Sequence, residues 1–205
     1  MNTRKAVFLD NDGTMLRSIE IAHEAACAVI REAGGRPPAF DEYVKHAHPP
    51  FAAFYARCNV FASEAKLWQE FSAIVDFDRA ELFPDVLDVL DRLSARGRKL
   101  GLISAQHTHI LHRLCGQHGI MRFFNAGVVG DANEKHFAIK AMCEDIGVLP
   151  ENVDYVGDTP SDMIGATLAG VRAVGITRGN DIRSILEAAG ASLVIEHLDE
   201  LLNHV

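Results

Sequence analysis

The sequence predicts an α/β protein built on a doubly wound parallel sheet. Along most of the chain, short apolar runs alternate with helical patterns, as they do in consecutive βαβ units. Acidic and hydroxyl side chains follow directly on several of these runs, and ligands bind outside the carboxyl ends of strands in an open parallel sheet. The alternation breaks down over residues 17–82, which predicts an inserted subdomain.

Six apolar runs are expected to form the strands. They are Ala6–Asp10, Lys99–Ser104, Ala126–Val129, Val153–Val156, Ala173–Ile176 and Ser192–Ile195. The helical patterns between them end at glycines, a common way for a helix to stop. An apolar stripe of Val86, Leu87, Leu90 and Leu93 precedes Gly97, Phe137–Ile146 precedes Gly147, and Asp162–Ala169 precedes Gly170.

The interruption has a helical pattern of its own. Residues 18–33 carry one apolar face and close at Gly34 and Gly35, and a proline-rich break follows. Shorter helical patterns cover Phe51–Phe61 and Glu64–Val75, and the chain re-enters the sheet domain at Phe83. We therefore expect a core formed by residues 1–16 and 83–205, with a helical cap at residues 17–82.

Composition excludes several classes of protein. A formal net charge of −8 over 205 residues argues against a nucleic-acid or anionic-membrane binder, because both need a basic surface. No apolar run approaches the ~18 residues of a membrane span. The apolar segment before Asp10 is too short for a signal peptide, so a cytoplasmic protein is expected. The four scattered cysteines fit reduced, buried thiols.

The acidic residues at the strand ends predict a metal site. Side chains alternate along an extended segment, so Asp10 and Asp12 point the same way and repel each other. Asp158 and Asp162 follow another strand and add two more carboxylates at the same edge of the sheet. Four converging acids call for a hard divalent cation, and Mg²⁺ is the cation that takes carboxylate oxygens and keeps waters for a phosphate.

Two further residues suit an anionic substrate. Ser104 can donate a hydroxyl hydrogen, and Lys135 can direct a positive charge at a phosphate. Each also has an ordinary structural interpretation. Ser104 could cap the next helix, Lys135 could be a solvated surface residue with Lys140 as its rival, and Asp162 could interact with a helix dipole.

These motifs resemble those of the haloacid dehalogenase superfamily, specifically its phosphatases with a helical cap. The resemblance covers essentially the whole chain. The first motif is DNDGT at residues 10–14, the second is Ser104, the third is best matched by Lys135, and the fourth is GDTPSD at residues 157–162. The first and fourth motifs together carry most of the resemblance.

The resemblance implies a mechanism. Asp10 would attack phosphorus and form an aspartyl-phosphate, and Asp12 would protonate the leaving alcohol. Asp10, the backbone carbonyl of Asp12 and Asp158 would hold Mg²⁺, with Asp162 in the first or second shell. Ser104 and Lys135 would neutralise charge on the phosphoryl group.

The expected function is hydrolysis of a small phosphorylated metabolite by a Mg²⁺-dependent phosphatase, acting as a monomer or homodimer. A sugar-phosphate mutase would use the same residues, and a catalytically silent protein could use the fold for binding. Asn11, Ala105, His136 and Arg17 depart from the family pattern, so no particular substrate is assigned.

Overall fold

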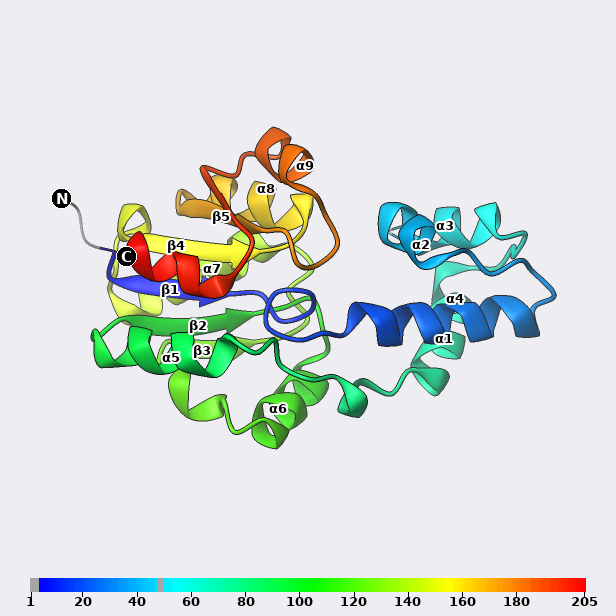
Figure 1. Cartoon of the computed structure of the whole chain (residues 1–205), viewed down its shortest axis with the longest axis horizontal. Coiled ribbons are helices and arrows are strands. Elements are labelled where there is room, and N and C mark those ends of the chain that lie inside the picture. The colour runs from blue at the N-terminus through cyan, green and yellow to red at the C-terminus, as the bar shows by residue number, and fades with distance from the viewer. Residues whose placement is uncertain (1–3, 48–49) are drawn as a thin grey trace. The chain divides into compact units, whose positions relative to one another are not determined.

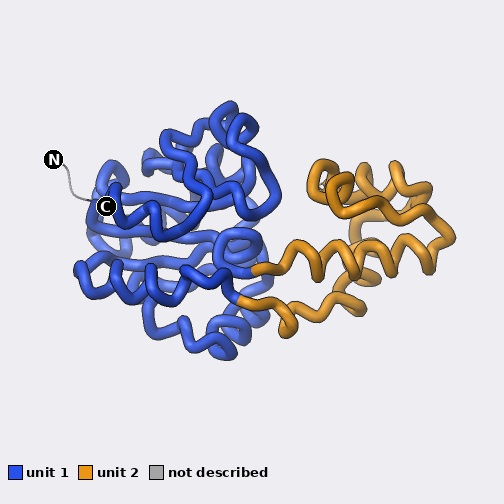
Figure 2. The backbone as a smooth tube through the Cα atoms, in the orientation of Figure 1, with its two compact units in different colours: residues 1–16, 82–205 blue, residues 17–81 orange. Residues whose placement is uncertain are grey.

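A computed structural model gives the fold of the chain and describes residues 4–47 and 50–205. The chain divides into two compact units, coloured separately in Figure 2. The first runs from the N-terminal end to Leu16 and resumes at Leu82. The second comprises Arg17–Glu81.

A six-stranded sheet forms the centre of the first unit. Its strands are β1 (Ala6–Leu9), β2 (Lys99–Ile103), β3 (Gly127–Val129), β4 (Val153–Gly157), β5 (Arg172–Ile176) and β6 (Leu193–Ile195). Their order is β3-β2-β1-β4-β5-β6, and every pairing is parallel. In this register Leu9 lies opposite Leu102 on one side and Val156 on the other. The predicted doubly wound α/β fold is confirmed.

Helices cover both faces of the sheet, α5 and α6 on one side and α8 and α9 on the other (Figure 1). Side chains of β1 alternate between the two faces of the sheet and so contribute to both helical layers. Val7 and Leu9 join the apolar cluster under α5 (Val86–Ala95), α6 (Thr108–Gln117) and the short helix η4 (Leu198–Asn203). Ala6 and Phe8 join the opposite cluster, under α7 (Lys135–Ile146), α8 (Pro160–Ala169) and α9 (Arg183–Ala188).

One residue of the expected apolar stripe is misplaced. Leu87 is 46% exposed, and the buried face of α5 contains Val89 between Val86 and Leu90. Residues three and four apart share a helix face, whereas a neighbour in sequence is turned about 100° away. The sequence stripe therefore should have included Val89 in place of Leu87.

The regular elements of the second unit are all helices in the part of the chain that the structure describes. It contains α1 (Ile19–Glu32), α2 (Phe40–His46), α3 (Phe51–Arg57), α4 (Glu64–Ile74) and the single turn η1 (Phe77–Arg79). Its own apolar cluster includes Val29, Ile30, Phe54 and Leu67. Helix α2 lies where the sequence indicated only a proline-rich break, because its seven residues are too few to show a clear period.

The short helices η2 (Met121–Phe123) and η3 (Pro150–Asn152) complete the core unit. All four cysteines are free and buried, as expected. Within the described ranges, no helix has both the length and the apolar character needed to cross a bilayer.

Candidate active site

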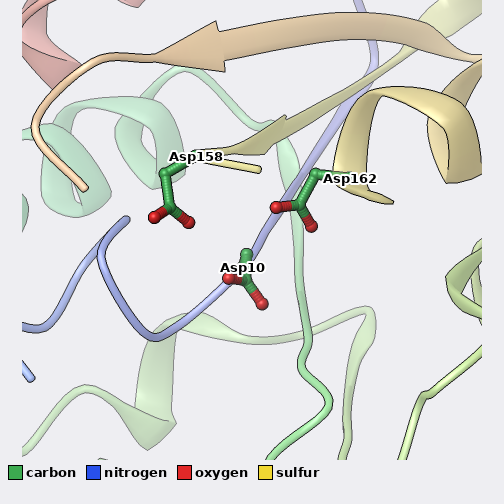
Figure 3. Close-up of side chains that lie close together, drawn as sticks. All are labelled: Asp10, Asp158 and Asp162. Atoms are coloured by element: carbon green, nitrogen blue, oxygen red, sulfur yellow. The ribbon is translucent and has the colours of Figure 1, made fainter. Parts of the chain in front are cut away.

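Three buried aspartates meet at the carboxyl edge of the sheet (Figure 3). Asp10 follows β1, Asp158 follows β4, and Asp162 lies in the first turn of α8. Each offers a carboxylate oxygen, and these oxygens all lie within 4.8 Å of one another. The strand order places β1 beside β4, so two segments far apart in sequence end at the same point.

Lys135, the first residue of α7, enters this cluster from a neighbouring element. Its Nζ lies 2.9 Å from Oδ1 of Asp10 and also donates to Oδ1 of Asp162. The side chain is 7% exposed, whereas that of Lys140 on the same helix is exposed. The structure thus brings Lys135 to the acids, and Lys140 is not among the contacts of the cluster.

Asp162 is heavily engaged by protein donors. Its Oδ2 accepts hydrogen bonds from the backbone N–H of Thr159 at 3.0 Å and from the Thr159 hydroxyl at 2.6 Å. Its Oδ1 faces the Tyr155 hydroxyl at 3.2 Å as well as Lys135. Asp162 therefore completes the capping box of α8 and holds the Lys135 ammonium, so its two structural roles coexist.

Asp158 is held by groups from two other loops. The Thr14 hydroxyl donates to Oδ1 at 3.3 Å. The backbone N–H of Asn180 donates to Oδ2 at 2.7 Å, and the Asn180 side chain does so at 3.1 Å. A methyl group at Gly179 would overlap this carboxylate, so the loop after β5 approaches Asp158 as closely as only glycine permits.

Burial and mutual repulsion govern the ionisation of the cluster. Burial raises the pKa of Asp10 to about 7, with Asp162 adding to the rise and Lys135 opposing it. Burial also raises the pKa of Asp158, and the charges of Asp162 and Asp10 act in the same direction. One ammonium therefore does not offset three carboxylates in this buried site.

The donor set of the cluster fits a divalent cation. The contributing atoms are all carboxylate oxygens, which Mg²⁺ prefers to nitrogen or sulfur. A cation would also relieve the repulsion that raises the pKa values of Asp10 and Asp158. The residues present are thus suited to a hard divalent metal.

Asp12 lies in the tight loop that leaves β1. The carbonyl of Asn11 accepts the backbone N–H groups of Met15 and Leu16 at 2.8 and 2.9 Å, and Gly13 adopts a positive φ of 73°. Asp12 is partly exposed, and the Asn11 amide donates to its Oδ2 at 3.3 Å. Its side chain is not a member of the group of three close carboxylates.

Ser104 follows β2 at the same edge of the sheet and is 2% exposed. Its Oγ accepts the backbone N–H of Gln106 at 3.2 Å, which leaves the hydroxyl hydrogen to donate to another acceptor. The next helix, α6, has His107 as its N-cap, so Ser104 does not cap it.

Sequence reasoning missed three residues around the acids: Tyr155 and Asn180, which contact them directly, and Arg178, which binds the backbone carbonyl of Thr14 in the loop after β1. Tyr155 lies within β4 and reaches Asp162, and the other two follow β5. The run of polar residues directly after β5 was an available signal, because it has the same position as the residues that were found.

Comparison with known proteins identifies the family of the chain. A family model described as haloacid dehalogenase-like hydrolase matches residues 7–176. A phosphoglycolate phosphatase from Pseudomonas putida is 28% identical over 214 residues, which cover 97% of this chain and 78% of that protein. A phosphoglycolate phosphatase from Shigella boydii is 25% identical over 179 residues, which cover 85% of this chain and 66% of that relative.

The fold also matches solved structures. A haloacid dehalogenase-like family hydrolase from Streptococcus pneumoniae superposes with a TM-score of 0.89 at 25% identity. The match covers 100% of this chain and 99% of that one. The family match along the chain and the architecture of this solved structure therefore indicate the same family.

Proposed function

The chain belongs to the haloacid dehalogenase-like hydrolases, and from this premise we propose that it is a Mg²⁺-dependent phosphatase of small phosphorylated metabolites. The observation that carries the proposal is the buried meeting of Asp10, Asp158 and Asp162 with the Lys135 ammonium. This arrangement combines a nucleophile, a cation site and a fixed positive charge.

Asp10 is the proposed nucleophile. One of its oxygens forms a bond to phosphorus as the bond from phosphorus to the leaving oxygen breaks, which gives an aspartyl-phosphate. The contact with Lys135 at 2.9 Å favours the ionised carboxylate, which is the reactive form. Water then attacks phosphorus, releases phosphate and restores the Asp10 carboxylate.

Asp12 is the proposed proton carrier. Its protonated carboxyl gives a proton to the leaving oxygen in the first step and takes one from the attacking water in the second. Its partial exposure and its place outside the close carboxylate group suit a residue that exchanges protons. Asp10 and Asp12 thus have different tasks although they are two residues apart.

Lys135 and Ser104 are the proposed phosphate-binding groups. Both are buried at the carboxyl edge of the sheet, and both can donate hydrogen bonds to phosphoryl oxygens. Fixed donors in a water-poor site stabilise the charge that develops in phosphoryl transfer without reorganising.

Asp10 and Asp158 are the proposed side-chain ligands of Mg²⁺, together with the backbone carbonyl of Asp12. Mg²⁺, when bound, would neutralise charge on the phosphoryl group. Asp162 already accepts hydrogen bonds on both oxygens, so we propose that it holds Lys135 in place and does not bind the metal directly.

The substrate is proposed as a small phosphate monoester, with 2-phosphoglycolate first in line because two similar proteins are phosphoglycolate phosphatases. The test is phosphate release from a panel of sugar phosphates, phosphoglycolate and p-nitrophenyl phosphate, each with Mg²⁺ and with excess chelator. Metal-dependent release from at least one ester is expected. Isomerised sugar phosphate without free phosphate would identify a mutase, and no turnover on any ester would point to a silent binding protein.

A further inference from the structure

Arg178, in the loop after β5, forms hydrogen bonds to the backbone of the turn that contains Asp12. Its Nε and one Nη donate to the backbone carbonyl of Thr14 at 3.0 and 2.6 Å. The other Nη donates to both carboxylate oxygens of Asp85 at 2.6 and 2.7 Å. The side chain is only 9% exposed, so these are buried, charge-assisted bonds of the strong kind.

The guanidinium also packs against an aromatic ring. It lies 4.2 Å from the centroid of the Phe83 ring. Asp85 precedes α5 and also accepts the backbone N–H of Leu198 at 2.7 Å, which fixes its carboxylate. Arg178 therefore joins the exit of β5, the start of α5 and the loop after β1.

Thr14 is held from two sides. Arg178 binds its carbonyl, and its hydroxyl donates to Asp158 at 3.3 Å. Asp12 is two residues earlier in the same closed turn, in which Gly13 N–H bonds back to the carbonyl of Leu16 at 2.9 Å. A shift of the Thr14 carbonyl therefore moves the backbone that sets the position of Asp12.

A second Arg–Asp pair, at the other end of β5, forms no hydrogen bond to the turn that contains Asp12. Arg172 donates to Asp154 at 2.8 and 2.5 Å, and the Asp154 carboxylate is fully buried. Its contacts lie at the amino end of β4 and at His204, away from the three aspartates. The two arginines have similar partners, but only Arg178 also binds a carbonyl of the catalytic turn.

We infer that Arg178 is a positioning residue, which holds the Asp12 carboxyl in line with the leaving-group oxygen. The inference rests on the proposed phosphatase function. Proton delivery by Asp12 matters most when the leaving group is a poorly stabilised alkoxide, and it matters little for p-nitrophenolate. A displaced Asp12 should therefore harm alkyl phosphates more than p-nitrophenyl phosphate.

The experiment compares kcat/KM of Arg178→Gln with that of the intact protein on three probes. These are p-nitrophenyl phosphate, phenyl phosphate and the alkyl phosphate that the intact protein hydrolyses fastest. We expect a loss of about 10²-fold on the alkyl ester, as for a misplaced catalytic group, and of less than about tenfold on p-nitrophenyl phosphate. Arg172→Gln is the matched control, with equal and small losses on all three probes. Asp12→Asn should reproduce the selective pattern of Arg178→Gln with larger losses.

Equal losses on all three probes in a folded Arg178→Gln protein, or no loss, would overturn the inference. Absence of turnover by the intact protein on every ester would instead overturn the proposed function. If Arg178→Gln does not fold, Arg178→Lys and Asp85→Asn provide the test. Lysine keeps the charge beside Asp85 but cannot span both acceptors, so stability should recover while the preference for good leaving groups persists. Asparagine at residue 85 keeps an acceptor for Leu198 but loosens Arg178, and the same preference is expected.

Discussion

The ammonium of Lys135 and the carboxylate of Asp10 lie 2.9 Å apart inside the core, each with less than a tenth of its side chain exposed. They come from segments 125 residues apart in the chain. Lys135 also contacts Asp162, so one cation links the end of β1 to the first turn of α8. This relationship couples the charge of the proposed nucleophile to the stability of the fold.

Replacing Lys135 by methionine should therefore damage both activity and stability. The substitution leaves three buried carboxylates without their cation, and breaking a buried pair costs about 3–5 kcal/mol. The free energy of unfolding, measured by urea denaturation in chelator, should fall by this order, and added Mg²⁺ should recover part of it. Loss of one stabilising donor should also lower kcat by about 10²–10³-fold.

Lys140→Met is the matched control, since Lys140 is an exposed lysine on the same helix. Its effect on stability is expected to stay within about 0.5 kcal/mol. Equal effects of the two substitutions on stability and kcat would contradict the proposal that Lys135 stabilises the buried carboxylates.

In the metal-free protein, the contribution of Asp10 to the free energy of unfolding should decrease as the pH rises. Burial raises the pKa of Asp10 to about 7, whereas in the unfolded chain it is about 3.9. Between these values the folded state keeps a proton that the unfolded state releases, so unfolding becomes easier as protons are removed. The contribution is complete below about pH 4 and is lost as the pH passes through about 7.

Urea unfolding in chelator, at several pH values, isolates this contribution when the profile of Asp10→Asn is subtracted, because asparagine does not titrate. The difference in the free energy of unfolding should decline across the interval from pH 4 to 7. A flat difference would show that the pKa of Asp10 is not raised in the folded protein.

Asn180→Asp should weaken metal binding. Asn180 donates two hydrogen bonds to Asp158, and an aspartate there would remove the side-chain donor and add a repelling charge. Outer-shell substitutions typically cost 10–100-fold in metal affinity, so the Mg²⁺ dissociation constant measured by calorimetry should rise by about that factor. Asn203→Asp, at an exposed position, adds the same charge and should leave it unchanged. An unchanged Mg²⁺ affinity in the Asn180 variant would show that the loop after β5 does not contribute to metal binding.

The sequence predicts the fold and the acids well because both depend on local patterns. Apolar runs mark the strands, and a motif directly after a strand has to lie at the carboxyl edge of a parallel sheet. The proximity of Asp10 and Asp158 could therefore be predicted from the sequence alone. The α5 stripe was wrong at Leu87 because neighbouring apolar residues do not show which of them faces the core.

Other parts of the site depend on distant partners that no local pattern shows. Lys135 and Lys140 lie on one helix, and only tertiary packing buries the first beside Asp10. Arg178 binds a backbone carbonyl 164 residues away, which has no signature in side-chain identity. The sequence pattern thus indicates the proposed reacting groups but not the residues that hold them in place.

The most direct test of the whole account is the rate of phosphate release by Asp10→Asn, measured with Mg²⁺ on the best ester of the panel. Asparagine has nearly the same shape but is a far weaker nucleophile, and the circular dichroism spectrum should match that of the intact protein. We expect kcat to fall by about 10⁴-fold or more, as when the nucleophile of a catalytic triad is removed. A folded variant that releases phosphate at the rate of the intact protein would contradict the assignment of Asp10 and the mechanism built on it.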